Sequence, residues 1–378
     1  MKIAHLSPEF SPAIGGVGQV VREIAKRQAQ KGHEVHVYAP AWDKRTRTPA
    51  GDELIDNIKV HRIAYWFKAA NFMTFWPSVF SKLIKENFDV IHSHLFAHPH
   101  FIFAATAAKI TGAKHIHTTH CPWSDAHRSA AGRIGILISY NIFSRFALKL
   151  TDKIIAITPW EKIFIRKYGG EKNKIIVIPN GMDETFFKKI KNNDFKKKHK
   201  IKGRLVLFFG RLNQTKGPDK FVEIAKLITK ERKDITFVML GPDEGMKSLV
   251  QKKIGNEKKI LLLQETRDRN KIIKMYQSAD VYVMPSYREG LPLTLFEAMA
   301  SGLPIVATPV NGIPYELKEP ENGFLVNYGD NKKFKKKILE LLDNRELSKK
   351  ISLNNIKKSR QYSWNKISEK TFALYKND

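Results

Sequence analysis

The sequence predicts an α/β fold built from two doubly wound parallel sheets. Short apolar runs alternate with helix-period segments along almost the whole chain, which is typical of parallel strands covered by helices. This pattern stops at a lysine-rich stretch, 184–204, and then starts again. At 378 residues with 42% apolar content, the chain is long enough for two domains that each bury a core.

The expected strands are short runs rich in Ile, Val, Leu and Phe. Those of the first half are 2–7, 34–39, 58–63, 89–94, 114–119, 153–158 and 174–179. Those of the second half are 204–210, 235–241, 259–264, 281–286, 304–309 and 323–327. The lysine-rich stretch between them sets the expected boundary, with a first domain over 1–190 and a second from 191. Ligands of such sheets bind beyond the carboxyl ends of the strands.

Composition limits the cellular setting and the partners. The formal charge of +29 implies attraction to something acidic, and a phosphorylated substrate, a membrane surface or a nucleic acid all fit it. One cysteine, Cys121, cannot make an internal disulfide, and no signal-peptide core opens the chain, so we expect a cytoplasmic protein. No apolar run approaches the roughly 20 residues of a membrane span. The nearest, 134–150, predicts a long and mostly buried helix.

Glycines mark the first junction between a strand and a helix. Gly15, Gly16 and Gly18 let the backbone approach a ligand closely, and the helix that follows offers free N–H groups to an anion. A phosphate fits there. The dinucleotide fingerprint needs a glycine where this chain has Val21, so a nicotinamide cofactor is not expected. A glycine turn that serves only backbone geometry is the alternative.

A second anion site is indicated after the first strand of the second half. Gly210 frees the turn, Arg211 and Lys216 flank the loop, and Pro218 stands at a favoured early helix position. Arginine offers a bidentate fork and lysine a compact charge, and together with a helix start they suit a diphosphate. Taken alone, a surface Arg and Lys are usually solvated.

Two carboxylates, Glu289 and Glu297, lie on either side of a turn that enters a helix. A helix start attracts anions, so Glu289 beside a diphosphate has to face hydroxyl groups instead. A hydrolase pair of carboxylates stays open, because spacing in sequence does not measure their separation. A glutamate that merely complements the helix dipole fits Glu289 better than Glu297, which stands among apolar residues.

Histidines crowd the first domain. Alternate residues of a strand share a face, so His92 with His94, or His115 with His117, could ligate one metal ion. A catalytic zinc site needs three convergent ligands, and no Asp-x-Asp pair occurs in the sequence, so no metal is expected. His120, at the end of its strand, is the histidine best placed to reach a substrate.

Together these motifs resemble the retaining GT-B glycosyltransferases of glycosyltransferase family 4. The resemblance rests, in chain order, on GGVGQVVREIA, DVIHSH, HTTHCPW, IPNGMDETFF, GRLNQTKG, ADVYVMPS and EGLPLTLFEAMASGLPIVAT. It implies two Rossmann-like domains facing a cleft, the second over 191–362, and a C-terminal helix, 363–378, that packs back on the first. It also implies sugar transfer from a nucleoside-diphosphate donor with retention and without a metal or other cofactor.

By position, the resemblance implies a role for each motif. Glu297 binds the ribose hydroxyls, Glu289 touches the donor sugar, and His120 lines the reaction centre. The implied catalytic residues are His120, Glu289, Arg211 and Lys216. The implied donor-binding residues are Gly15, Gly16, Arg211, Lys216, Arg267, Asp268, Glu289, Gly290, Leu291, Pro292, Leu293 and Glu297. Asp268 could accept from a guanine edge and Arg267 could stack on either base, so UDP-sugars and GDP-sugars both stay open.

An aromatic and basic segment, 65–87, is the candidate acceptor side of the first domain. Its aromatic residues are Trp66, Phe67, Phe72, Phe75, Trp76 and Phe80. Interleaved with lysines, they fit a segment in a lipid headgroup layer, and equally a helix that covers the sheet or lines a sugar pocket. We therefore expect a sugar, lipid-linked or small-molecule acceptor, with an anionic membrane surface at the inner face of the cell membrane as a further partner.

Two other functions compete with sugar transfer. A phosphorylase or hydrolase of sugars on the same fold would share the phosphate sites. A nucleic-acid-binding protein would explain the charge, but it requires a basic stripe with stacking aromatics. The lysines instead cluster in 184–204 and in the C-terminal helices, away from the motif loops, so no nucleic acid is expected.

Overall fold

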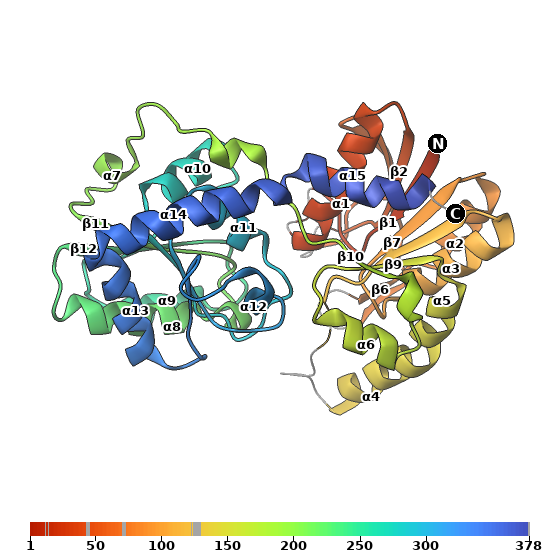
Figure 1. Ribbon diagram of the computed structural model, residues 1–378. Coiled ribbons are helices and arrows are strands. Elements are labelled where there is room, and N and C mark those ends of the chain that lie inside the picture. The colour runs from red at the N-terminus through yellow and green to blue at the C-terminus, as the bar shows by residue number, and fades with distance from the viewer. Residues whose placement is uncertain are drawn as a thin grey trace. The chain divides into compact units, whose positions relative to one another are not determined.

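Two separate sheets organise the chain in the computed structural model, as the sequence predicts (Figure 1). The structure describes residues 1–11, 13, 15–42, 46–69, 73–121, 123 and 130–376. It divides the chain into unit 1, Met1–Asn180 with Trp364–Asp378, and unit 2, Gly181–Ser363. The division falls at residue 180 rather than 190 because the lysine-rich stretch belongs to unit 2. Within it, Ile190 N donates to Gln277 Oε1 at 3.0 Å.

The sheet of unit 1 has the strand order β10-β9-β8-β7-β1-β2-β4-β3. Its strands are β1 (Lys2–Leu6), β2 (Glu34–Pro40), β3 (Gly51–Ile55), β4 (Ile58–Ile63), β7 (Val90–His94), β8 (Lys114–Thr118), β9 (Lys153–Ala156) and β10 (Ile175–Val177). All pair in parallel except β3, which is antiparallel to β4. Every strand expected in the first half is present. The pattern missed β3, an exposed edge strand whose sequence, GDELI, lacks an apolar run.

Helices cover both faces of this sheet. They are α1 (Gly16–Gln30), α2 (Ser78–Lys85), α3 (Pro99–Thr111), α4 (Ala130–Ile138), α5 (Arg145–Leu150), α6 (Glu161–Lys167) and α15 (Trp364–Lys376), with short helical turns η1 (Ser139–Ser144) and η2 (Lys172–Lys174). The C-terminal helix α15 packs against α1, as expected (Figure 1). Arg27 Nε donates to Asn365 Oδ1 at 2.7 Å, and the rings of His33 and Phe372 stack at 4.6 Å.

The aromatic segment 65–87 is mostly core rather than one exposed helix. It forms a hairpin of β5 (Phe67–Ala69) and β6 (Met73–Phe75), followed by α2. Trp76 is fully buried, and Phe75 and Phe80 are partly buried, whereas Trp66 and Phe67 are 70% and 53% exposed. Phe72 lies outside the described residues. Of these aromatic residues, only Trp66 and Phe67 are therefore exposed enough to contact a lipid headgroup layer.

The prediction of a mostly buried helix over 134–150 was wrong. The segment forms α4, the π-helix η1 and α5, and one face of it is exposed. Its large exposed apolar residues are Ile134, Leu137, Ile138, Ile142, Phe143 and Phe146. Composition misled the interpretation, because an apolar run does not reveal which of its faces another element covers.

The sheet of unit 2 has the strand order β13-β12-β11-β14-β15-β16, and all of its pairings are parallel. Its strands are β11 (Arg204–Phe209), β12 (Ile235–Leu240), β13 (Ile260–Leu262), β14 (Val281–Met284), β15 (Ile305–Ala307) and β16 (Phe324–Leu325). They match the runs expected in the second half. The GT-B fold class, with two doubly wound parallel-sheet units, is confirmed.

The helices of unit 2 alternate with its strands. They are η3 (Glu184–Phe187), α7 (Phe195–Lys198), η4 (Gln214–Lys216), α8 (Pro218–Thr229), α9 (Lys247–Ile254), α10 (Arg269–Ser278), α11 (Leu293–Ala300), α12 (Ile313–Glu316), α13 (Asn331–Asp343), α14 (Arg345–Ser359) and η5 (Arg360–Tyr362). The strand order reverses between β11 and β14, and in unit 1 between β1 and β7. Ligands of open α/β sheets bind at such switch points, so each unit has one place where a site is expected.

Gly217 lets the loop after β11 lie against the end of β14. It adopts a left-handed φ of +65°, and a Cβ atom there would stand 2.1 Å from the carbonyl oxygen of Pro285. Tyr287 N and Arg288 N both donate to Thr215 O, at 2.8 and 3.1 Å. The two loops at the switch point of unit 2 are therefore joined by backbone contacts that only a glycine permits.

Replacing Gly217 with Ala should lower the free energy of unfolding by about 3 kcal/mol, since left-handed strain adds to a backbone clash. Gly329→Ala is the matched control. Its φ is +85°, and nothing lies within 4 Å of the added Cβ, so it should lose only about 1 kcal/mol. Urea unfolding of both variants measures the difference, and equal losses would show that the approach to Pro285 is not limiting.

Candidate active site

The loop between β11 and α8 carries Arg211 and Lys216, the two cations predicted to bind a diphosphate. Asn213 caps the turn η4, and its Oδ1 accepts from Lys216 N at 3.2 Å and from the Thr215 hydroxyl at 2.8 Å. Pro218 then opens α8 at a position where no backbone N–H is needed. Because both ends of the loop are fixed, Lys216 is held at the switch point of the sheet.

Lys216 pairs with Glu289, which stands in the loop after β14. Lys216 Nζ donates to Glu289 Oε2, and the two side chains are only 17% and 4% exposed. Ser286 Oγ donates to the other oxygen of Glu289 at 2.8 Å. Asn311 Nδ2 and Gly312 N donate to the carbonyls of Glu289 and Gly290, which fixes the backbone of this loop. Two predicted site residues from separate loops are thus brought together.

The start of α11 follows this pair directly. Pro292 is its N-cap residue and has no side-chain oxygen with which to cap the helix. Leu293 begins the helix, Gly290 and Leu291 form the turn before it, and Leu291 is buried. The first backbone N–H groups of a helix carry a partial positive charge, so this end suits an anion.

Arg211 makes a different contact from the one expected. Its Nη1 pairs with Glu244 of the loop after β12, at 2.8 Å, instead of standing beside Lys216. Asn213 Nδ2 also donates to Glu244, at 2.7 Å. This pair is about two-fifths exposed, where ion pairs are weak and exchange readily, so Arg211 can turn to an incoming anion.

Glu297 has partners of its own. Arg269 Nη1 donates to its Oε1 at 3.3 Å and the Tyr276 hydroxyl to its Oε2 at 3.2 Å. Burial raises the pKa of Glu297, and Arg269 opposes that rise. Arg269 also pairs with Asp183 at 3.2 Å and lies over the ring of Phe186. The two glutamates therefore belong to separate polar clusters.

Asp268 and Arg267, the predicted base-contacting residues, lie in the loop before α10. The Asp268 carboxylate is the N-cap of α10 and accepts from Asn270 N and Lys271 N, at 3.0 and 3.3 Å. These donors lower its pKa. Arg267 is exposed. The Asp268 carboxylate, which could have accepted from a guanine edge, thus already caps α10.

In unit 1, a side chain of the protein itself stands at the start of α1. Gly18 N donates to Glu9 Oε1 at 3.2 Å, and a Cβ on Gly15 would stand 1.8 Å from that oxygen. Gly15 is the N-cap of the helix, and nothing lies within 4 Å of a Cβ on Gly16. The expectation of a phosphate at this helix start therefore meets a carboxylate already in place.

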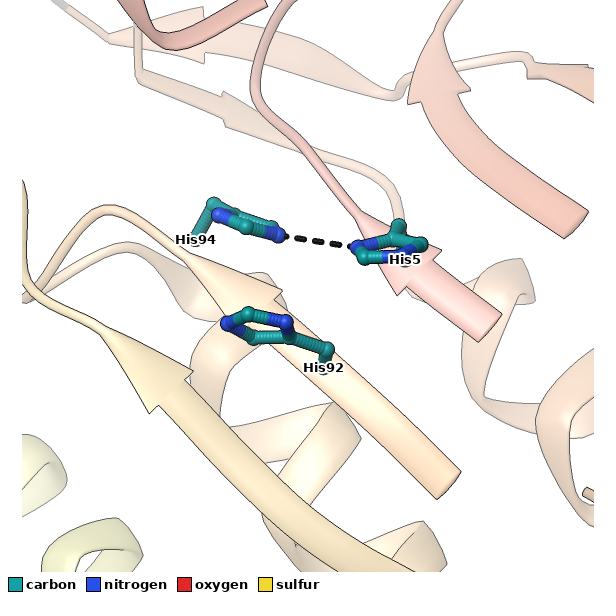
Figure 2. Close-up of side chains that lie close together, drawn as sticks. All are labelled: His5, His92 and His94. Atoms are coloured by element: carbon teal, nitrogen blue, oxygen red, sulfur yellow. Dashed lines mark hydrogen bonds between the residues drawn. The ribbon is translucent and has the colours of Figure 1, made fainter. Parts of the chain in front are cut away.

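Histidines from neighbouring strands meet at the switch point of unit 1 (Figure 2). His5 Nδ1 lies 3.1 Å from His94 Nε2, and His94 Nδ1 lies 3.1 Å from His120 Nε2. At the other end, His5 Nε2 lies 2.7 Å from Gln28 Oε1. His92 stacks on His94 at 4.1 Å and contacts the Tyr375 hydroxyl at 2.6 Å. His120 thus ends a series of polar contacts that begins at Gln28 of α1 and passes through His5 and His94.

These histidines are also the candidate metal ligands, since His5, His92 and His94 each offer a nitrogen within 4.8 Å of the others. All six of their ring nitrogens have hydrogen-bond partners, because His92 Nε2 also contacts Thr118 Oγ1 at 2.8 Å. His115 and His117, the other pair considered as metal ligands, both contact Ser93 Oγ.

A buried carboxylate shapes the loop that carries His120. Glu161 Oε1 accepts from Thr119 Oγ1, Cys121 N and Trp123 Nε1, at 2.6, 2.7 and 3.1 Å. Its other oxygen accepts from Ile157 N at 2.6 Å. Within this loop His120 and Cys121 adopt left-handed φ values of 57° and 56°, a strained conformation that these bonds hold in place.

Two family models match the chain. Glycosyltransferase Family 4 matches residues 14–186, and Glycosyl transferases group 1 matches residues 189–358. The chain belongs to the group 1 and family 4 glycosyltransferases that these two models describe. The two matches meet close to the division between unit 1 and unit 2, so each unit of the glycosyltransferase corresponds to one model.

Relatives cover almost all of this glycosyltransferase. The UDP-Gal:alpha-D-GlcNAc-diphosphoundecaprenol alpha-1,3-galactosyltransferase of Escherichia coli is 29% identical over 92% of this chain and 89% of its own. The D-inositol 3-phosphate glycosyltransferase of Corynebacterium diphtheriae is 25% identical over 99% and 94%. Among solved structures, HepE of Anabaena in complex with UDP shares the fold, with a TM-score of 0.79 at 18% identity over 99% of each chain.

Several residues that contact the candidate site were not predicted from the sequence. They are Asn213, Glu244, Arg269, Tyr276, Ser286, Asn311, Gln28 and Glu161. Arg269 had a local signal, because it follows Arg267 and Asp268 in the predicted base-contacting loop. Asn213 and Ser286 contact Lys216 and Glu289 only three residues away, although neither was singled out. The remaining residues contact site residues that are distant in sequence, so no local pattern indicates them.

The histidines should make unit 1 of the glycosyltransferase sensitive to acid. Burial lowers the pKa of each of these histidines: His5, His92, His94, His100, His115, His117 and His120. Below about pH 6.5 the unfolded chain binds protons that these folded rings do not, so stability falls as the pH falls. For His5, with a pKa of about 4, the loss at pH 5 is roughly 2 kcal/mol.

Unit 2 provides the internal control, since His199 is the one histidine of 181–363. Hydrogen exchange between pH 7 and pH 5 should show β1, β7 and β8 losing protection well before β11 and β14. The raised pKa of Glu161 acts in the opposite direction, but it is one group against seven. Equal loss of protection in both units would contradict the assignment of neutral buried histidines.

Proposed function

We propose that the protein is a retaining, metal-independent hexosyltransferase that moves a hexose from a nucleoside-diphosphate sugar to a hydroxyl acceptor. The Lys216–Glu289 pair carries this proposal. A buried cation and carboxylate stand together at the switch point of unit 2, directly before the open start of α11. This arrangement offers positive groups to a diphosphate and an acceptor oxygen to the hydroxyl groups of a sugar.

The chemistry needs both kinds of group. When the bond between the sugar C1 and the phosphate oxygen breaks, negative charge develops on the diphosphate, and fixed cations and helix N–H groups stabilise it. Lys216, Arg211 and the backbone of 290–293 supply these positive groups. The acceptor oxygen attacks C1 from the face that the phosphate leaves, and its proton passes to the departing phosphate oxygen. In this scheme Glu289 binds the sugar hydroxyls and is not a general base.

The nucleoside is proposed to lie against the second polar cluster. Glu297, held by Arg269 and Tyr276, accepts from the ribose hydroxyls, and Arg267 stacks on the base. We favour uridine over guanine, because the Asp268 carboxylate already caps α10. The names of relatives agree: the galactosyltransferase uses UDP-Gal, and HepE was solved with UDP and with UDP-glucose.

The competing enzyme functions predict different products. A hydrolase would release free sugar from the donor, and a phosphorylase would consume a glycoside with phosphate. Analysis of the product anomer separates them from a retaining transferase. A nucleic-acid-binding protein instead predicts tight, salt-sensitive binding in a gel-shift assay.

Thermal unfolding with nucleoside diphosphates and their sugars, in EDTA, tests the donor site. UDP-sugars at 100 times their Kd should stabilise the protein by about 2.7 kcal/mol, and GDP-sugars by less. Lys216→Met should abolish the ligand-induced shift, measured against the melting temperature of that variant without ligand. Lys220→Met is the matched control, because Lys220 pairs with Glu223 on α8, and it should keep the shift.

If no nucleotide stabilises the wild-type protein, the transferase proposal fails. If Lys216→Met keeps the full shift, the diphosphate lies elsewhere. A shift that requires added Mn²⁺ or Mg²⁺ would contradict the metal-independent mechanism. The three results concern separate parts of the proposal and can be told apart.

We further propose that the protein works at the inner face of the cell membrane and takes a lipid-linked acceptor. The exposed apolar residues of α4, η1 and α5 carry this part, at 44% to 60% exposure each. Exposed cations stand on the same helices at Arg133, Arg145 and Lys149, and the sequence has no acidic residue from 130 to 151. An apolar stripe with cations alone is complementary to an anionic lipid headgroup layer.

Among the described residues, no helix is long and apolar enough to cross a bilayer. Long lysine and arginine side chains can reach phosphates while the apolar side chains enter the headgroup region. The galactosyltransferase relative is named for a diphosphoundecaprenol acceptor, which is a lipid carrier, and this supports the same class of acceptor here.

Replacing Leu137 and Phe143 together with Ser should weaken binding to anionic phospholipid vesicles by roughly tenfold, since apolar area no longer leaves water. Both side chains are at least half exposed, so the fold should tolerate the change. Leu353→Ser, at a 60% exposed leucine of α14, is the matched control and should bind as the wild type does. Co-sedimentation at low salt measures binding, and failure of the wild type to bind would remove the membrane proposal.

A further inference from the structure

We propose that Gln28, His5 and His94 hold His120 in a single tautomer, with the proton on Nε2 and a lone pair on Nδ1. These four residues are called the histidine chain. They come from α1, β1, β7 and the loop after β8, and β1, β7 and β8 are adjacent in the sheet. The inference deepens the proposed function, because it assigns the state in which His120 meets a substrate.

The direction of the histidine chain follows from the Gln28 oxygen at one end, and one proton per ring then fixes the rest. A neutral imidazole has one N–H, so a nitrogen that accepts a hydrogen bond leaves its proton on the other nitrogen. Gln28 Oε1 can only accept, which places the proton of His5 on Nε2. His5 Nδ1 then accepts from His94 Nε2, and His94 Nδ1 accepts from His120 Nε2. One proton per ring satisfies every contact.

The rings stay neutral because nothing nearby supports a cation. His5 and His94 are fully buried, and no carboxylate among the described residues contacts any ring of the chain. Burial lowers the pKa of His5 to about 4 and that of His120 to about 3. A second proton on any ring would also turn an acceptor nitrogen into a donor that faces another donor. The chain is therefore consistent only when each ring is neutral.

The C-terminal helix α15 contacts the histidine chain indirectly, through His92. His92 stacks on His94, with ring centres 4.1 Å apart, and lies 5.2 Å from His5. Its own nitrogens are held by the Tyr375 hydroxyl of α15 and by Thr118 Oγ1. His92 thus packs against the rings of His5 and His94 without forming a hydrogen bond to either of them. Figure 2 shows it beneath the His5–His94 contact.

The free nitrogen of His120 is the functional end. Among the residues that the structure describes, His120 Nδ1 has no hydrogen-bond partner, and the residue is partly exposed. In the assigned tautomer this nitrogen accepts a hydrogen bond and cannot donate one. A sugar hydroxyl therefore donates to it, and a substrate oxygen without a proton at that position is disfavoured. Gln28, His5 and His94 are positioning residues in this arrangement, since none of them is proposed to touch substrate.

Nuclear magnetic resonance tests the tautomer directly and needs no substrate. In protein labelled with ¹⁵N-histidine, long-range ¹H–¹⁵N spectra distinguish a protonated ring nitrogen from an unprotonated one. We expect His120 to show a protonated Nε2 and an unprotonated Nδ1 at pH 7. A protonated Nδ1, or two protonated nitrogens, would overturn the proposal. So would a stoichiometric metal ion that metal analysis finds on His5, His92 and His94.

Gln28→Met tests whether the chain sets the tautomer. The substitution keeps the volume and removes the acceptor of His5, so His120 should show a mixture of both tautomers. Gln19→Met is the matched control, since Gln19 stands on the same helix and its side-chain amide donates to Glu23 rather than to a histidine. It should leave the His120 spectrum unchanged. An unchanged spectrum in Gln28→Met would also overturn the proposal.

Kinetics separate this inference from the proposed function. In Gln28→Met, the turnover of sugar transfer should fall in proportion to the fraction of His120 that takes the other tautomer, about twofold for an equal mixture. Its stabilisation by UDP should stay unchanged, because Gln28 lies in unit 1, outside the proposed donor site. If the wild-type protein transfers no sugar, the proposed function fails, while the wild-type spectrum still decides the tautomer.

Discussion

The ion pair between Lys216 and Glu289 is the contact on which the site of unit 2 depends. It joins the loop after β11 to the loop after β14, where the strand order reverses. Leaving either charge alone in this buried position would cost about 3 to 5 kcal/mol, so the two loops are fixed relative to each other. Gly217, Ser286 and Asn311 act on the same pair, the first by close approach and the others by hydrogen bonds.

Sequence patterns located the strands and the loops of the candidate site because these features are local. An apolar run of four to six residues predicts a parallel strand, and a glycine followed by cations predicts an anion loop. Lys216 and Glu289 could be predicted as neighbours, because the carboxyl ends of β11 and β14 meet at the switch point. Sequence spacing does not give the distance between Lys216 and Glu289, but the strand order of this fold class makes β11 and β14 neighbours.

The failures share a physical cause, which is that they depend on what covers a side chain. The segment 134–150 has the composition of a buried helix, yet it leaves six large apolar side chains exposed. Arg211 pairs with Glu244, and Asp268 caps α10, because a polar side chain bonds to whichever partner the tertiary fold provides. Burial and partner choice are long-range properties, so a single sequence does not contain them as a pattern.

The two units solve the same problem of buried polarity in opposite ways. At the switch point of unit 2, charges are paired: Lys216 with Glu289, and Arg269 with Glu297. At that of unit 1, neutral imidazoles and an amide share protons, and the fully buried carboxylate of Glu161 bonds to backbone and side-chain donors. On the proposed function, the paired charges of unit 2 can exchange partners with a diphosphate. In unit 1, neutral rings of fixed tautomer suit an uncharged hydroxyl group.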